Sequence, residues 1–306
     1  MHHYVIIGNG AAGVTAAEEL RRRDARASIT ICTDERFPMY SRPGLAYILI
    51  NEVSIDQAIA RKPGWYALQH IELIYSRATR IHFDRKVVQL ENGRGLIYDA
   101  LLIAVGAQSV PAPFPGGNLD GVLYLDTLDN TIELIERAKT AHGAVVVGGG
   151  ITALEMAEGL AHHKVETHYL VRKTNLWSAL LNDQESSLVE KQIHQRGVHI
   201  HYGQEIAEIS GQKGKVAAVK TNRGEMIPCE MVGVAIGVRA NLALTKDTPI
   251  KIDRGILTDE YLQTNMRGVF AAGDCAQIYD AWSGEHRVDS LWPTAIASGR
   301  IAAMNM

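Results

Sequence analysis

The sequence has few cysteines and no closely spaced pair of them. Its 306 residues include only Cys32, Cys229 and Cys275, which lie far apart in the chain. Without a Cys-x-x-Cys or a similar pair, the sequence indicates neither a zinc site nor a local redox-active disulfide. We therefore expect a reduced protein, for which a cytoplasmic location is the simplest interpretation.

Long apolar runs and an excess of charge of one sign are also missing. No stretch approaches the roughly 18 uninterrupted apolar residues of a membrane span, so we expect no transmembrane helix. The first residues lack the basic, apolar and small-residue regions of a secretory signal. The chain has 31 basic and 34 acidic residues, a formal net charge of −3. This balance argues against a dedicated nucleic-acid or membrane-surface binder.

The chain has 12 histidines, but their spacing does not predict a metal site. His162 and His163 are adjacent in an expected helix, so their rings point in different directions. His199 and His201 would share one face of a strand, but two ligands alone do not make a site. We therefore expect no bound metal.

Glycine is abundant, with 28 residues, and one cluster follows the first expected strand. Residues 3–7 form an apolar, β-branched run typical of a buried parallel strand. A Gly-x-Gly-x-x-Gly motif follows at residues 8–13, then a helix over 14–23, a strand over 28–32 and two acidic residues. This order predicts a dinucleotide site, with the pyrophosphate at the helix N-terminus and an acidic side chain on the ribose. The alternative is a glycine turn without a ligand. The candidate residues are Gly8, Gly10, Ala11, Ala12, Gly13, Asp34 and Glu35.

A second cluster repeats the pattern in the middle of the chain. An apolar run at 144–147 precedes a Gly-x-Gly-x-x-Ala motif at 148–153, an expected helix over 154–163 and a strand over 166–171. The strand ends in Arg172 and Lys173 where an NAD site would carry an acidic residue. Because these cations attract a 2′-phosphate, NADPH is favoured over NADH. The alternative is that both are solvated surface charges. The other candidates are Gly148, Gly150, Ile151 and Ala153.

Further segments resemble one family, the FAD-dependent pyridine nucleotide oxidoreductases, which bind two dinucleotides. The similar stretches are residues 99–113, 232–241, 268–276 and 291–306, and residues 40–45 (Tyr-Ser-Arg-Pro-Gly-Leu) resemble the branch without an active-site disulfide. That branch includes rubredoxin and ferredoxin reductases and the flavin part of nitrite reductase. The resemblance implies an α/β fold with two Rossmann-like domains. An NAD(P) domain over 110–238 would be inserted into an FAD domain made of 1–109 and 239–306.

The resemblance also implies site residues. Asp274 would hold the ribityl chain of the flavin, and Arg42 would pair with the FAD pyrophosphate, with a surface salt bridge as the alternative. Glu155 and Tyr47 are the catalytic candidates near the flavin; the alternatives are a helix-surface glutamate and a packed tyrosine. Tyr47 replaces a lysine, and Ile151 a gating tyrosine, of some relatives. The remaining cofactor-binding candidates are Pro43, Thr79, Ala104, Gly106, Leu291, Trp292 and Gly237.

The function implied is a FAD-dependent NAD(P)H oxidoreductase. Hydride would pass from NADPH, less favourably from NADH, to flavin N5, and electrons would continue to a redox protein, a partner subunit or a small acceptor such as oxygen or a quinone. The family's C-terminal interface domain has no counterpart in this sequence, so its dimerisation and docking are not expected here. This motivates one alternative, a flavoprotein subunit of a larger electron-transfer complex without stand-alone activity. A second alternative is a non-catalytic nucleotide-binding module. The sequence does not indicate the oligomeric state.

Overall fold

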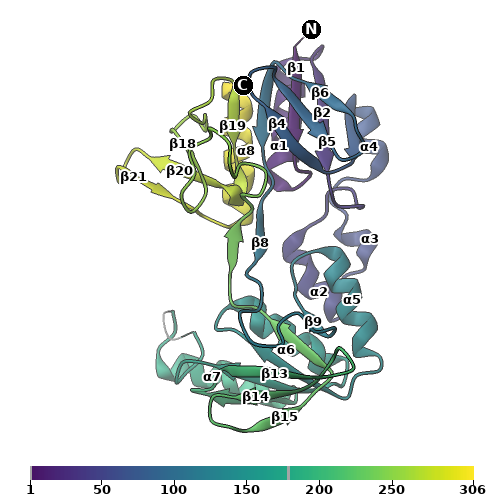
Figure 1. The fold of residues 1–306 in the computed structure, drawn as a ribbon, viewed down its shortest axis with the longest axis vertical. Helices are drawn as coiled ribbons and strands as arrows, with labels where there is room; N and C mark the ends of the chain where they lie inside the picture. Colours follow the sequence, from purple (N-terminus) through teal and green to yellow (C-terminus); the bar gives the residue numbers. More distant parts are fainter. Residues whose placement is uncertain (1, 178–179) are drawn as a thin grey trace. The chain divides into compact units, whose positions relative to one another are not determined.

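The computed structural model describes residues 2–177 and 180–306, which form two compact units. The first unit combines residues 2–41, 59–108 and 239–306, so it joins the start of the chain to its end (Figure 1). The second unit contains residues 42–58 and the described part of 109–238. The chain leaves the first unit after Gln108 and returns after Val238, through the short paired strands β8 (Ala107–Ser109) and β17 (Val238–Ala240).

The first unit is built on a five-stranded parallel sheet. Its spatial order is β19 (Val269–Ala271), β7 (Ala100–Ile103), β1 (His3–Ile7), β2 (Ser28–Thr33) and β3 (Ile71–Tyr75). All four residues of β7 are buried, as are the last three of β1, because helices or further sheets cover both faces of such a sheet. The apolar run at residues 3–7 thus gives the expected central strand.

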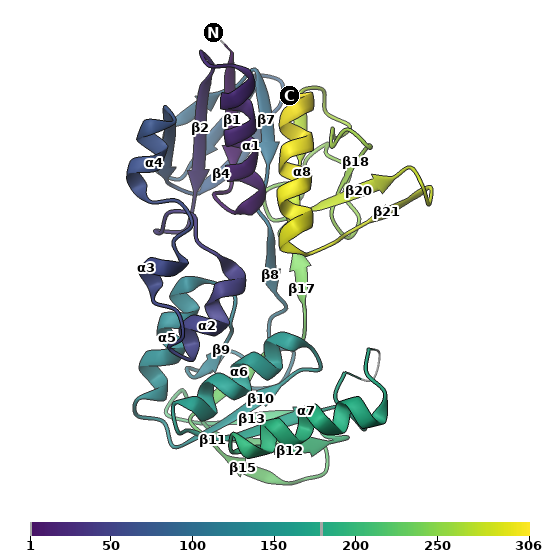
Figure 2. The ribbon, with the colours of Figure 1, turned by 180° about the vertical axis from the view of Figure 1, so that it is seen from behind.

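Two helices of the first unit, α1 (Ala11–Arg23) and α8 (Trp292–Asn305), lie side by side (Figure 2). They approach so closely that a Cβ atom on Gly299 would lie 2.2 Å from the carbonyl oxygen of Ala12. The third helix is α4 (Pro63–Leu68). Small residues therefore bring the N-terminal part of α1 against the C-terminal helix.

Two smaller three-stranded sheets complete the first unit. They consist of β4 (Ala78–His82), β5 (Val87–Leu90) and β6 (Gly95–Ile97), and of β18 (Ile256–Thr258), β20 (Ala276–Asp280) and β21 (Glu285–Arg287). From its sequence, the segment over residues 71–81 is predicted to be one strand. This prediction is wrong, because the segment divides at Ser76 into β3 of the parallel sheet and β4 of an antiparallel sheet.

The second unit has its own five-stranded parallel sheet. Its order is β12 (Val198–Tyr202), β11 (Glu166–Val171), β10 (Gly143–Val147), β16 (Met231–Val234) and β9 (Val122–Leu123). A three-stranded antiparallel sheet accompanies it, formed by β13 (Ile206–Gln212), β14 (Lys215–Thr221) and β15 (Met226–Pro228). The predicted α/β architecture with two Rossmann-like sheets is confirmed.

The main helices of the second unit are α5 (Leu128–Ala138), α6 (Ile151–His162) and α7 (Asp183–Gln195). Thr127 caps α5 by accepting a hydrogen bond from the Asn130 backbone N–H. A reciprocal capping box between Asn182 and Glu185 begins α7. Helices α1 and α6 each begin three residues before the predicted start, because Gly10 and Gly150 act as their N-caps.

Residues 42–58 group with the second unit, outside the range 110–238 expected for the NAD(P) domain. This segment contains the turn η1 (Arg42–Gly44) and the helices α2 (Leu45–Leu49) and α3 (Ile55–Ala58). Leu49 is fully buried against α6, where a Cβ atom on Gly159 would lie 2.3 Å from its side chain. The Leu49 carbonyl oxygen is also 2.7 Å from Nε2 of His163. Packing of Leu49 on α6 thus explains the placement.

Among the described residues, no helix has both the length and the apolar character needed to cross a membrane.

Candidate dinucleotide sites

The first candidate site lies at the carboxyl edge of the parallel sheet of the first unit. Strand β1 is central, and the chain continues to β2 on one side and to β7 on the other. The loops at residues 8–13 and 104–106 follow β1 and β7 at this edge. Open parallel sheets bind ligands at such a reversal of strand order.

The three glycines of the first motif have different structural roles. Gly8 has φ +114°, and a Cβ atom there would lie 2.1 Å from the carbonyl oxygen of Ala104. A Cβ atom on Gly13 would lie 2.0 Å from the carbonyl oxygen of Gly8. Gly10 has no neighbour within 4 Å of its Cβ position among residues 2–177 and 180–306. Gly8 and Gly13 are therefore required by packing, whereas Gly10 leaves open space at the N-terminus of α1, which fits a phosphate group.

Asn9 contributes a buried polar group that the sequence motif did not single out. Its Oδ1 accepts a 2.8 Å hydrogen bond from the hydroxyl of Tyr66, which itself accepts a bond from the Met39 backbone N–H at 3.1 Å. Asn9 Nδ2 is buried and has no hydrogen-bond partner among the described residues. A buried donor without a partner is costly, so this atom also fits a bound polar ligand. In the sequence, the only signal for Asn9 was that it is a polar residue between Gly8 and Gly10.

Other predicted residues gather at the same edge. Asp34 is exposed after β2, and Glu35 accepts a hydrogen bond from the Tyr40 hydroxyl. Asp274 lies in the turn η2 (Gly273–Cys275) directly after β19, where the Gly273 backbone N–H donates to Ser298 of α8 at 3.0 Å. The same edge thus carries the acidic candidates after two of its strands. The remaining members are Ala11, Ala12, Ala104, Gly106, Leu291 and Trp292, the last two at the start of α8.

Thr79 lies elsewhere in the first unit. It is exposed on β4, in the antiparallel sheet, and its hydroxyl donates to the Gln89 carbonyl oxygen at 3.2 Å. The structure therefore gives Thr79 a bond within that sheet, and its role toward a cofactor stays a prediction.

The second candidate site has the same topology in the second unit. Strand order reverses between β10 and β16, and a cavity of about 500 Å³ opens beside the loops that follow them. Gly148 has φ +151°, and a Cβ atom there would lie 2.1 Å from the Ala235 carbonyl oxygen and 2.9 Å from the Ala153 side chain. Within the described part of the chain, no atom lies within 4 Å of the Cβ positions of Gly149 and Gly150. A nucleotide phosphate therefore has room at the N-terminus of α6.

The far end of this cavity is polar and charged. The predicted Arg172 and Lys173 line it, and Arg172 Nε is 3.8 Å from a carboxylate oxygen of Glu205. Two further lining side chains each have a buried polar atom with no partner among the described residues, Nε1 of Trp177 and Oε1 of Gln204. Sequence reasoning missed several lining residues, and four of them have side chains with polar atoms and lie near Arg172 and Lys173 in the sequence or just after strand β12. They are Asn175, Trp177, Gln204 and Glu205, and their position after β11 and β12 was the available signal.

The two catalytic candidates lie on neighbouring helices of the second unit. Tyr47 is 51% exposed on α2, which packs against α6, where Glu155 is half-buried. Burial raises the pKa of Glu155 above its ordinary value. Ile151, at the start of α6, is 61% exposed. None of the three lines the 500 Å³ cavity, so their roles stay predictions.

Arg42 and Pro43 lie in η1 of the second unit. The Arg42 guanidinium donates to the carbonyl oxygen of Asp126 and lies 3.6 Å from its carboxylate. Asp126 also accepts a 2.9 Å bond from the Ser109 backbone N–H. Arg42 thus has a protein partner in its own unit, as the salt-bridge alternative expected, and its pairing with a pyrophosphate stays a prediction. Gly237, which has φ +119°, lines the second cavity.

The cysteines are buried and unpaired. Burial raises the pKa of Cys32 and Cys229 to about 12 and that of Cys275 to about 11, so these thiols are poor nucleophiles at neutral pH. In the described ranges 2–177 and 180–306, no cluster of three or more histidine, cysteine, aspartate or glutamate residues is arranged to hold a metal ion.

Two known reductase-type proteins match most of this chain in sequence. Rhodocoxin reductase of Rhodococcus erythropolis is 32% identical over 274 residues, which cover 89% of this chain and 64% of that protein. The assimilatory nitrate reductase electron transfer subunit of Bacillus subtilis is 28% identical over 275 residues, 89% of this chain and 36% of that protein. The chain thus spans less than two thirds of both relatives.

A solved structure and a family model extend the comparison. A ferredoxin reductase of Rhodopseudomonas palustris superposes with a TM-score of 0.92 at 27% identity, covering 99% of this chain and 75% of that one. FAD and NAD(P)H, the cofactors expected from the sequence, are those of the family whose model matches residues 2–299. The chain therefore belongs to the pyridine nucleotide-disulphide oxidoreductase family.

Proposed function

We propose that the chain is the nucleotide-binding part of a FAD-dependent NAD(P)H oxidoreductase, with FAD on the first unit and NADPH on the second. The observation that carries the proposal is the pair of switch-point sites, each with an open glycine position at a helix N-terminus. A fold with two dinucleotide sites suits a reaction between two dinucleotide cofactors.

The residues of the first unit would hold the FAD. The open position at Gly10 and the N-terminus of α1 receive the pyrophosphate, and Asn9 Nδ2 supplies a donor without a partner among the described residues. Asp34 or Glu35 accepts from the ribose hydroxyls, and Asp274 accepts from the ribityl chain. The N-terminus of α8 favours negative charge beside it. When bound, the flavin supplies the redox chemistry, taking up hydride and passing electrons on.

NADPH is our preferred nucleotide for the second unit. Arg172 and Lys173 line the polar end of the cavity and carry the positive charge that a 2′-phosphate needs. The phosphates would lie at Gly149 and Gly150, where none of the side chains described by the structure occupies the space.

For the electron acceptor we propose a small redox protein. The relatives described above include reductases whose names specify rhodocoxin and ferredoxin. A second candidate is a subunit of a larger electron-transfer complex without stand-alone activity, which the similarity to the Bacillus subtilis electron transfer subunit favours. A reducing, cytoplasmic location belongs to the proposal, because the three cysteines are unpaired.

Anaerobic reduction of the FAD-loaded protein tests the proposal. We expect NADPH to bleach the flavin absorbance at lower concentrations than NADH. Arg172→Glu should weaken NADPH binding by about tenfold or more, because it removes a charge-assisted bond to phosphate. Arg254→Glu, a reversal of an exposed charge in the other unit, is the matched control and should change nothing.

Three outcomes separate the alternatives. Bound FAD that neither nucleotide reduces would contradict the reductase. Reduction by NADPH, together with negligible turnover of artificial acceptors and a co-purifying partner, would favour the subunit. An unchanged NADPH affinity in Arg172→Glu would remove the 2′-phosphate assignment.

A further inference from the structure

One acidic side chain, that of Glu205, lies beside the basic residues at the polar end of the second cavity. Glu205 and Arg172 both line the cavity, and Glu205 Oε1 is 3.8 Å from Arg172 Nε. Both side chains are well exposed, at 48% and 75%. An exposed pair of this kind contributes little to stability, so it does not lock Arg172 in place. The informative feature is that the cavity lining carries a negative charge, on Glu205, directly beside Arg172.

The loop that carries Glu205 is tied to the strand end that carries Arg172. The backbone N–H of Gly203 donates to the carbonyl oxygens of Val171 at 2.8 Å and Lys173 at 3.2 Å. Gly203 has φ +65°, so a residue that tolerates the left-handed region is needed at this turn. The backbone that carries Glu205 is therefore held beside the strand end that carries Arg172 and Lys173.

The other side of the loop is held by the turn between β14 and β15. The Glu205 backbone N–H donates to Asn222 Oδ1 at 3.1 Å, and the Asn222 backbone N–H donates to the Glu205 carbonyl oxygen at 3.0 Å. The Arg223 guanidinium donates to the Tyr202 carbonyl oxygen at 3.2 Å. These bonds fix the backbone of Glu205 and leave its side chain to face the cavity.

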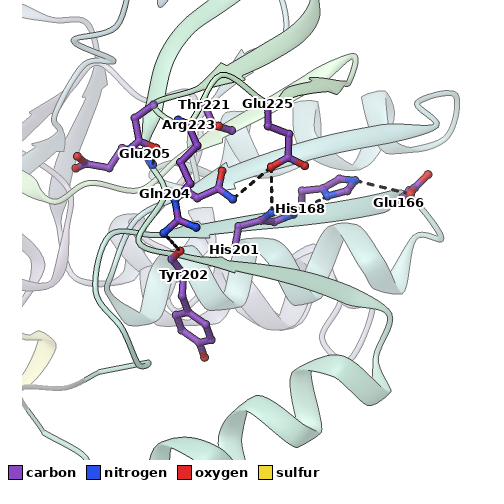
Figure 3. Close-up of polar contacts among 10 residues, drawn as sticks. Glu166, His168, His201, Tyr202, Gln204, Glu205, Thr221, Arg223 and Glu225 are labelled. Carbon is purple, nitrogen blue, oxygen red and sulfur yellow. Dashed lines mark hydrogen bonds and ion pairs between the residues drawn. The ribbon is translucent and has the colours of Figure 1, made fainter.

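The side chain of Gln204 ties the loop after β12 to Glu225. Its Nε2 donates to a carboxylate oxygen of Glu225 at 3.3 Å, and Glu225 also lies 3.8 Å from the ring of His201 (Figure 3). Figure 3 shows the carboxylate of Glu205 pointing away from this cluster of Gln204, Glu225 and the histidines. Both residues line the cavity, but Gln204 is held by its bond to Glu225, whereas the Glu205 carboxylate lies on the side of Arg172.

We propose that Glu205 is a specificity-determining residue of this cavity, which weakens binding of a 2′-phosphorylated nucleotide relative to its unphosphorylated counterpart. The inference rests on the proposed function, since it needs a nucleotide in this cavity. A 2′-phosphate close enough to pair with Arg172 lies near the Glu205 carboxylate, and the two anions repel each other. An unphosphorylated ribose carries no such charge. The chain therefore discriminates between the two nucleotides less sharply than Arg172 and Lys173 alone would allow.

Binding of two nucleotide fragments tests this, without depending on activity. We would titrate the FAD-loaded protein calorimetrically with adenosine 2′,5′-bisphosphate and with adenosine 5′-monophosphate at low salt. Glu205→Gln, which keeps the shape and removes the charge, should tighten binding of the bisphosphate about fivefold and leave the monophosphate nearly unchanged. High salt should reduce this difference, because the site is exposed.

Glu208→Gln is the matched control. It removes the same charge from an exposed position on β13 that does not line the cavity, and should leave the bisphosphate-to-monophosphate affinity ratio at its wild-type value. Glu205→Lys, a second variant, should raise the ratio beyond that of Glu205→Gln.

The outcomes separate the inference from the function it rests on. If the wild-type protein binds neither fragment, the proposed nucleotide site fails and the inference with it. If the wild type binds both and neither Glu205 variant changes the ratio, only the role of Glu205 is overturned. A ratio raised equally by Glu208→Gln would also overturn it, because the effect would then come from net charge.

Discussion

At the scale of single residues, the two glycine motifs separate what the fold needs from what a ligand needs. Gly8 and Gly13 face backbone oxygens that a Cβ atom would strike, at 2.1 and 2.0 Å. Gly10, between them, has open space around its Cβ position. Its backbone is extended, with φ −88° and ψ −168°, a conformation that any residue adopts. A substitution at Gly10 should therefore affect the ligand and spare the fold.

We predict that Gly10→Val folds but loses FAD. The cost in stability should be about 1 kcal/mol or less, since only the preference of the N-cap position changes, whereas FAD affinity should fall at least about tenfold because the side chain fills the space at the helix N-terminus. Flavin absorbance per protein and urea unfolding of the FAD-free protein measure the two effects.

Two further glycine variants complete this test. Gly64→Val, at another glycine with an open Cβ position, should retain FAD. Gly13→Ala should lower the stability of the FAD-free protein itself. Full FAD content in Gly10→Val would show that the pyrophosphate does not approach there.

The residues of the second cavity show how far sequence reasoning reaches at this scale. Arg172 and Lys173 follow a recognisable strand in the second motif, and both do line the cavity. Trp177, Gln204 and Glu205 could not be selected, because loop residues have no periodicity. The parallel pairing of β11 with β12, a tertiary contact, brings the loops after those strands to the same edge of the sheet.

At the scale of elements, helix α1 carries a compact charge cluster of its own. Glu19 is 7% exposed and accepts hydrogen bonds from Arg22, at 3.0 and 2.6 Å, and from Arg23, at 2.6 Å. The bonds from Arg22, then those from Arg23, lower the pKa of Glu19 from 4.5 to about 2. Because the folded-state pKa lies below the unfolded value, the ionised carboxylate stabilises the fold above about pH 4.5, and this contribution is lost as the pH falls toward 2.

We predict that Glu19→Gln lowers the urea midpoint at pH 7 and that its difference from the wild type shrinks steadily as the pH falls from 4.5 toward 3. Unfolding curves at closely spaced pH values measure this. Glu91→Gln, at an exposed turn, should change stability by less than about 0.5 kcal/mol throughout. A difference for Glu19→Gln that stays constant with pH would assign its effect to packing.

Strands were predictable where a run of apolar residues continues without interruption. The buried strands β1, β10 and β11 match their predicted residues closely, because strands covered on both faces read as continuous apolar runs. The segment 71–81 looked equally continuous, yet β3 pairs in parallel with β2 while β4 pairs antiparallel with β5. The change of partner at Ser76 is a tertiary effect with no local signal.

At the scale of the whole molecule, the backbone passes between the two units more often than the sequence suggested. The passages after Gln108 and Val238 lie within one residue of the predicted boundaries at 109 and 238. The excursion over residues 42–58 was not predicted, because it is short and its apolar residues look the same whichever core receives them. Which unit binds FAD and which binds NAD(P)H stays a proposal.

We predict that Leu49→Ala destabilises the second unit. Leu49 is fully buried against α6, and removing such a side chain costs about 2–5 kcal/mol. Hydrogen exchange read by mass spectrometry should show the loss of protection first in α6 and β10. Leu68→Ala, at a residue that is 78% exposed, is the control. Loss of protection confined to residues 2–41 would contradict the assignment of residues 42–58 to the second unit.

The excursion over residues 42–58 also determines how the protein can be divided. Because the backbone passes between the units four times, cutting at one linker does not yield two intact pieces. An expressed fragment limited to residues 109–238 would lack Leu49 and present a bare apolar surface on α6 to water. Such a fragment would be prone to self-association, whereas a synthetic peptide spanning residues 42–58 would be its natural complement.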